Sequence, residues 1–75
     1  MGRKKLKQED IQRRISLALQ ALGKSWFAEA SLVKESKMRL QSVRLEIERL
    51  VAAGLLDHDV VGRYAYYRLS ERWKK

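Results

Sequence analysis

Positions 40–56 read LQSVRLEIERLVAAGLL, and this stretch decides the fold. Its apolar side chains recur at intervals of three and four residues, which is the spacing of one face of an α-helix. The buried stripe is expected to consist of Val43, Ile47, Leu50 and Val51, with Leu40 at its edge. Gly54 can take the left-handed conformation that closes a helix, and Leu55 can fold back on the last turn. The stretch therefore predicts an amphipathic helix over residues 40–53.

Two more helices are predicted on the N-terminal side of this stretch. The first covers residues 8–22, where the apolar positions with helical spacing are Ile11, Ile15, Ala18, Leu19 and Leu22. We expect Asp10 or a neighbour to cap its start and Gly23 to end it. A short extended piece at 24–27 is expected to place Trp26 and Phe27 in the core. Residues 28–34 favour a helix, and 36–39 favour a turn.

The C-terminal side predicts a β-hairpin. Residues 55–60 and 64–69 are rich in strand formers, and a turn at 61–63 contains Gly62. Alternation sends the side chains of Ala65, Tyr67 and Leu69 to one face of the return strand and those of Tyr64, Tyr66 and Arg68 to the other. The order is helix, short strand, helix, helix, strand, strand, in one α+β domain over residues 9–70. A basic arm (1–8) and a basic tail (71–75) flank it.

The composition favours a polyanionic partner. Lys and Arg number 17 against 9 Asp and Glu, for a net charge of +8, whereas an excess that merely aids solubility is seldom so one-sided. The chain has no cysteine, which excludes disulfides and thiolate chemistry. His58 stands between Asp57 and Asp59, but alternation along a strand points those carboxylates away from it. We therefore expect no catalytic residue, no metal site and no cofactor, and a protein that is not an enzyme.

Two segments resemble bacterial winged-helix regulators of the arsenic-repressor and multiple-antibiotic-resistance repressor types. Residues 50–55 match a Leu-x-x-Ala-Gly-Leu pattern, and residues 62–69 match Gly-Arg-x-x-x-Tyr-x-Leu. The resemblance covers roughly residues 25–70. It implies a winged helix-turn-helix of three helices with a C-terminal β-hairpin wing, in which the third helix enters the major groove of DNA.

The chain departs from those families in three ways. It lacks the Cys and His ligands of the metal sensors, and it lacks the long extra helices that form dimers and ligand sites in the antibiotic-type regulators. Ser36 stands where those families place an apolar residue. The resemblance thus implies a DNA-binding core without a sensor, and no small-molecule ligand is expected.

The resemblance and helical geometry together predict the DNA-contacting residues. They are Lys37, Arg39, Gln41, Ser42, Arg44, Leu45, Arg63 and Tyr64. Arginine can bond guanine, glutamine can bond adenine, and leucine can meet a thymine methyl group. Lys34 and Lys37 would lie near phosphates, and Arg63 near the adjacent minor groove.

The alternative for these residues is an ordinary solvated surface. Glu46 and Glu48 count against a DNA face, and we expect them to pair with Arg44, Arg49 or solvent.

The predicted partner is double-stranded DNA, bound by a small transcription regulator that is a candidate homodimer. Such a protein would be cytoplasmic and nucleoid-associated when bound, with no membrane contact. Two alternatives stay open at this point. One is a module that binds DNA or RNA without sequence preference, and the other is a winged-helix protein-interaction module of a larger complex.

Overall fold

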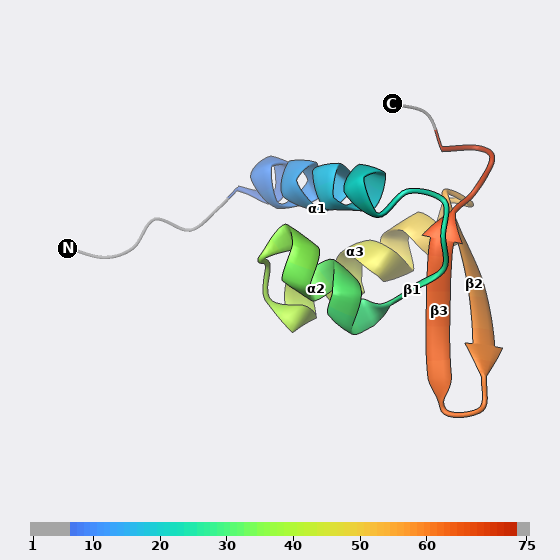
Figure 1. Cartoon of the computed structure of the whole chain (residues 1–75). Coiled ribbons are helices and arrows are strands. Elements are labelled where there is room, and N and C mark those ends of the chain that lie inside the picture. Colours follow the sequence, from blue (N-terminus) through green and yellow to red (C-terminus); the bar gives the residue numbers. More distant parts are fainter. Residues whose placement is uncertain (1–6, 74–75) are drawn as a thin grey trace.

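Three helices lie on one side of a small antiparallel sheet (Figure 1). The computed structural model describes residues 7–73. Its elements are α1 (Gln8–Leu22), β1 (Phe27–Ala28), α2 (Glu29–Ser36), α3 (Leu40–Ala52), β2 (Leu56–Val61) and β3 (Tyr64–Leu69). This order is the predicted one, and the α+β winged helix-turn-helix is confirmed. The predicted arm and tail fall partly on residues 1–6 and 74–75, which lie outside the described residues.

The start of α1 corrects the predicted cap. Lys7 is the N-cap residue and makes no side-chain capping bond, whereas Asp10 lies inside the first turn. A capping side chain must precede the helix to reach its free N–H groups, so Asp10 stands too late in the chain for that role. It still favours the helix, because a carboxylate in the first turn opposes the positive end of the helix dipole. Asp10 also lies 3.7 Å from the guanidinium of Arg13.

The end of α3 closes as predicted. The Leu55 N–H donates to the Leu50 carbonyl at 2.8 Å, and the Gly54 N–H donates to the Val51 carbonyl at 3.0 Å. Gly54 has a φ of 77°, which a residue with a side chain rarely adopts. The pair of bonds and the positive φ form a Schellman closure, so the recognition of Gly54 as the stop signal is confirmed.

The core lies where the helices meet the inner face of the sheet. It consists of Ile15, Ala18, Leu19, Phe27, Leu32, Val43, Ile47, Leu50, Leu56 and Leu69. Trp26 is not among them, and 43% of its surface is exposed, so the prediction that both adjacent aromatic residues fill the core is wrong for Trp26. The reason is strand alternation, because neighbouring residues at a strand point to opposite faces.

Strand β3 occupies the centre of the sheet, in the order β1-β3-β2. Tyr67 pairs with Phe27 on one side and with His58 on the other, and its ring stacks on His58 at 5.2 Å between centroids. The predicted division of faces on β3 agrees with this register. The turn is shorter than predicted: Val61 belongs to β2, and only Gly62 and Arg63 form the tip. Gly62 has a φ of 64°, as the first position of a tight two-residue hairpin turn requires.

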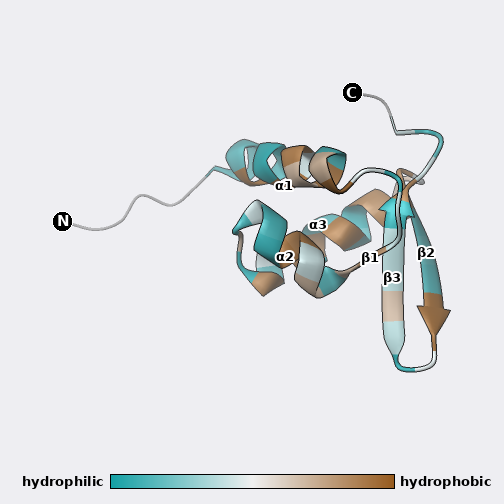
Figure 2. Cartoon of the chain, viewed as in Figure 1, coloured by the Kyte–Doolittle hydropathy of each residue, from teal (hydrophilic) through white to brown (hydrophobic). Residues whose placement is uncertain are grey.

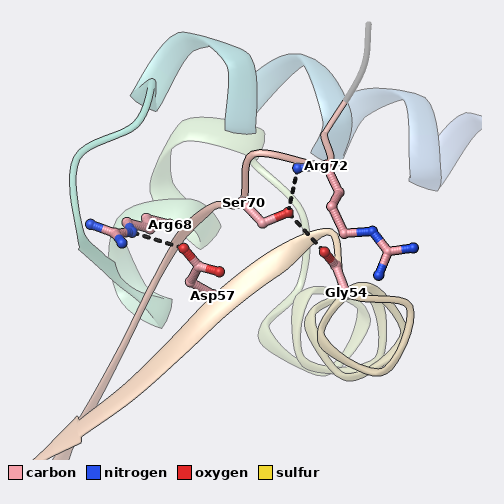
Figure 3. Close-up of polar contacts among 5 residues, drawn as sticks. All are labelled: Gly54, Asp57, Arg68, Ser70 and Arg72. Atoms are coloured by element: carbon pink, nitrogen blue, oxygen red, sulfur yellow. Dashed lines mark hydrogen bonds and ion pairs between the residues drawn. The ribbon is translucent and has the colours of Figure 1, made fainter.

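Ser70 joins the end of β3 to the end of α3 (Figure 3). Its hydroxyl donates to the Gly54 carbonyl at 2.7 Å and accepts from the Arg72 N–H at 3.1 Å. Its own N–H donates to the Leu55 carbonyl at 3.1 Å. Trp73 packs against the core beyond it. The packed structure therefore continues to Trp73, past residue 70, and the base of the hairpin is fastened to the helix.

Candidate nucleic-acid interface

The solvent-facing side of α3 presents three adjacent side chains of different chemistry. Gln41, Arg44 and Leu45 are related by three and four residues, so they are neighbours on one helix face. All three are exposed, and Leu45 has 63% of its surface in contact with solvent. An arginine, an amide and an isobutyl group thus lie side by side on the same exposed surface.

The turn before α3 supplies cations. Lys37 takes the left-handed conformation with a φ of 58°, and it is exposed, as are Lys34 and Arg39. The structure explains why Ser36 can stand where the arsenic-repressor and multiple-antibiotic-resistance repressor families place an apolar residue. Ser36 is buried, and its hydroxyl accepts a hydrogen bond from the Met38 N–H at 3.2 Å. A polar group is satisfied there by the turn itself, which removes the need for an apolar residue.

Ser42 is the least exposed of the residues predicted on α3. It is half-buried, whereas Arg39, Gln41, Arg44 and Leu45 are exposed. The structure places all of these on the turn and first half of α3, but Ser42 has less surface to offer a partner.

Arg44 makes a contact that sequence analysis did not find. Its Nε donates to Oε1 of Glu29, at the start of α2, at 3.1 Å. The Glu29 side chain is 30% exposed and that of Arg44 is 57% exposed. No local pattern could have revealed the pair, because fifteen positions separate the two residues and only the packing of α2 against α3 brings them together.

Glu46 is buried and does not share the exposed face of α3. Only 3% of its side chain is exposed, and it accepts two hydrogen bonds from Arg49, one of them from Nε at 3.0 Å. The bond to this carboxylate raises the pKa of the Arg49 guanidinium above its ordinary value. The expected pairing with Arg49 is present, and Glu46 therefore does not oppose a ligand in front of Gln41 and Leu45. Its position between Val43 and Leu50 at helical spacing was the available signal for burial.

Charges of both signs surround the hydroxyl of Tyr67, next to α3. Burial raises the pKa of Tyr67, the negative charges of Glu29 and Glu48 raise it further, and Arg44 opposes them. Glu48 is exposed. The field beside Arg44 is therefore mixed rather than strongly positive, whereas the turn at Lys37 and Arg39 is basic.

The hairpin tip forms a second exposed surface. Arg63 is exposed in the turn, Tyr64 is 66% exposed, and Val60 and Val61 are similarly uncovered. The hairpin reaches past the helices, and its apolar end on β2 lies away from them (Figure 2). The structure thus places Arg63 and Tyr64 on a different element from the α3 residues.

Arg68 is engaged within the sheet. Its Nε donates to Asp57 on the neighbouring strand at 2.9 Å (Figure 3). Its guanidinium also lies 4.5 Å from the centre of the Trp26 ring. Asp57 on the wing is thereby paired, so its charge is partly compensated before any ligand approaches.

A shallow cleft separates α3 from the inner face of the hairpin. Its volume is about 260 Å³, and it is lined by Ile47, Glu48, Val51, Ala52, His58 and Tyr67. Within residues 7–73, His, Asp and Glu side chains do not gather in groups of three or more that would hold a metal ion. No helix in this range is long and apolar enough to cross a bilayer.

Solved structures share this fold at low sequence identity. A homodimeric winged helix-turn-helix DNA-binding domain from Mycobacterium bovis, described as a possible ArsR-family transcriptional regulator, is 20% identical, with a TM-score of 0.60 over 92% of this chain and 75% of that one. TubR, a type III plasmid segregation protein, is also 20% identical, with a TM-score of 0.64 over 95% and 81%. At this identity the matches show the fold alone.

A human enzyme contains the same fold as a small part. N-acetylserotonin methyltransferase is 19% identical, with a TM-score of 0.67 over 85% of this chain, which spans only 19% of the enzyme. None of the curated proteins matches the chain.

The sequence also matches a protein-family model. The model of the PaaX-like proteins matches residues 23–73, which include α2, α3 and the whole hairpin. The match covers more than half of the chain and all of the exposed residues on α3 and the wing. The chain is therefore a member of the PaaX-like protein family.

Proposed function

We propose that the protein binds duplex DNA as a small transcription regulator, with α3 in the major groove and the hairpin on the adjacent backbone or minor groove. The observation that carries this proposal is the exposed triad Gln41, Arg44 and Leu45. On this face Leu45, which is 63% exposed, lies beside an arginine and an amide, so three different chemistries meet on one exposed surface. A major groove offers each of them a partner, since base edges present guanine acceptors, adenine donor–acceptor pairs and thymine methyl groups.

Phosphate contacts would come from the basic turn and the tip. Lys34, Lys37 and Arg39 are exposed before and at the start of α3, and Arg63 is exposed on the wing. Such contacts provide most of the affinity and fix the orientation on the duplex, whereas the triad provides the sequence preference. The two sets lie on different elements, which suits a helix in one groove and a wing beside the next.

A solved structure with the same fold supports this assignment. The Mycobacterium bovis domain is described as DNA-binding and homodimeric, which supports a homodimer of this protein on a palindromic site. We propose no catalytic activity, no cofactor and no small-molecule ligand for residues 1–75, and a cytoplasmic, nucleoid-associated location in the bound state.

The decisive experiment compares three nucleic acids. Bound sequences are first selected from a random duplex pool. The chain is then titrated with the selected duplex, a random duplex and a structured RNA at one salt concentration, and its mass in solution is measured. Tighter binding to the selected duplex supports the proposal. Equal affinity for both duplexes favours a binder without sequence preference, and no affinity for any of the three favours a protein-interaction module.

We expect Arg63→Ala to weaken duplex binding several-fold at moderate salt without changing the melting temperature. Arg63 is exposed at the tip and makes no ion pair among the described residues, so its loss should leave the fold intact. Titration and thermal melting of the same preparation provide both values. Arg14→Ala on α1 is the matched control, because it too removes an exposed arginine that makes no ion pair among the described residues. Equal affinities of the two variants for the duplex would show that the hairpin tip is not part of the interface.

A further inference from the structure

The Arg44 side chain is held at its Nε atom by Glu29, a residue whose backbone is fixed by both a helix and a strand. Glu29 is the first residue of α2, and the residue before it, Ala28, pairs with Tyr66 in the sheet. Its carboxylate therefore projects from a backbone that both a helix and a strand fix. The bond from Arg44 Nε to Glu29 Oε1, at 3.1 Å, links α3 to this fixed point.

The bond leaves one end of the guanidinium free. An arginine has five N–H donors, and the one on Nε is used by Glu29, so the two terminal nitrogens keep four. Guanine presents two acceptors side by side in the major groove, O6 and N7, which match two terminal nitrogens of an arginine approaching end-on. Because the side chain is already held, it loses less rotational freedom when it binds.

The same pair is poorly suited to a phosphate. Glu29 compensates the charge of Arg44, and exposed Glu48 lies on the same helix near the shared neighbour Tyr67. A phosphate is attracted mainly by net positive charge, whereas a base edge is uncharged and selects by hydrogen-bond geometry. The surroundings of Arg44 thus favour a base over the backbone.

We propose that Glu29 is the positioning residue that holds Arg44 for end-on recognition of one guanine, an inference that rests on the proposed binding of duplex DNA. Glu29 touches no DNA itself. It determines specificity by fixing the direction of the Arg44 side chain. Without Glu29 the arginine is still present, but its side chain is no longer held in one orientation.

Two substitutions separate the hydrogen bond from the charge. Glu29→Ala and Glu29→Gln remove the same negative charge, so any general gain in affinity for DNA is equal in both. Only the glutamine keeps an oxygen that accepts from Arg44 Nε. The difference between the variants therefore reports on the hydrogen bond to Arg44 alone, and random-duplex affinity provides the measure of the general charge effect.

The readout is the loss of affinity when single guanines of the selected duplex are replaced by 7-deazaguanine, which lacks the N7 acceptor. For the wild type we expect one guanine, once per half-site, to lose about tenfold on this change. Arg44→Ala should abolish that loss. Glu29→Ala should reduce it to about threefold or less, Glu29→Gln should keep more of it, and the losses at other guanines should not change.

The outcomes are distinct. A 7-deazaguanine penalty in Glu29→Ala that equals the wild-type penalty overturns the positioning role, while duplex binding itself still stands. Equal weakening at every guanine also overturns it, because it indicates a general structural defect. A loss of the penalty in both Glu29 variants supports the role and assigns the hold to the carboxylate charge. Failure of the wild type to bind any duplex instead rejects the proposed function.

Discussion

Ile47→Ala is expected to lower the free energy of unfolding by about 2–5 kcal/mol, because it removes buried methyl groups and leaves a cavity. Ile47 is 3% exposed on the inner side of α3, among the core residues. A 75-residue domain has a stability of roughly 4–11 kcal/mol. The variant should therefore melt far below the wild type, and at the low end of that stability range a large part of it should be unfolded at 37 °C.

Leu45→Ala is the matched control for this substitution. It shortens an aliphatic side chain two positions earlier on the same helix, but that side chain is 63% exposed. Its effect on stability should stay within about 0.5 kcal/mol. Urea unfolding followed by circular dichroism measures both variants. Similar midpoints for Ile47→Ala and Leu45→Ala would mean that the inner and outer faces of α3 have been assigned wrongly.

Duplex affinity should fall steeply with salt. If about four to six phosphates are neutralised, the slope of log affinity against log salt is about −4 to −5, so raising salt from about 50 to 200 mM should weaken binding roughly 250- to 1000-fold. The structure identifies exposed cations that can supply these contacts, namely Lys34, Lys37, Arg39 and Arg63. Arg49 and Arg68 are already paired within the chain.

The slope can be traced to single residues. Lys37→Ala should make it shallower by about one unit, because one phosphate contact is lost. Arg68→Ala should leave the slope nearly unchanged, since its charge is compensated by Asp57. Fluorescence titrations at four or five salt concentrations are sufficient. A flat response of the wild type would contradict DNA binding driven by phosphates.

Local patterns were enough to predict the elements of this chain. The bounds of α1 agree with the prediction, and those of α3 differ by one residue, since helical spacing of apolar residues and the glycines at 23 and 54 are signals within the segment itself. The wrong placements had local causes too. The adjacent aromatics at 26 and 27 predict two core residues, although alternation separates them and exposes Trp26. The acidic start of α1 predicts a cap by Asp10 or a neighbour, but Asp10 lies inside the helix and Lys7, the N-cap residue, makes no side-chain capping bond.

The candidate site was harder to predict because its contacts join distant positions. Helical spacing places Gln41, Arg44 and Leu45 on one face, and they are exposed. Spacing cannot show that Glu29 bonds Arg44, since this depends on how α2 packs on α3. Whether the predicted residues bind DNA stays a prediction.

Ser70 has a consequence for the register of any bound duplex. Its hydroxyl and N–H bind the end of β3 to the carbonyls of Gly54 and Leu55, which follow α3, so the base of the wing is tied to the helix. In the proposed complex, the helix and the wing tip would then contact the duplex at a fixed distance from each other. Adjacent base pairs are about 3.4 Å apart along the duplex axis. Inserting one base pair between the segment under α3 and the segment under Arg63 therefore moves one of them out of reach, even though every contacted base is still present.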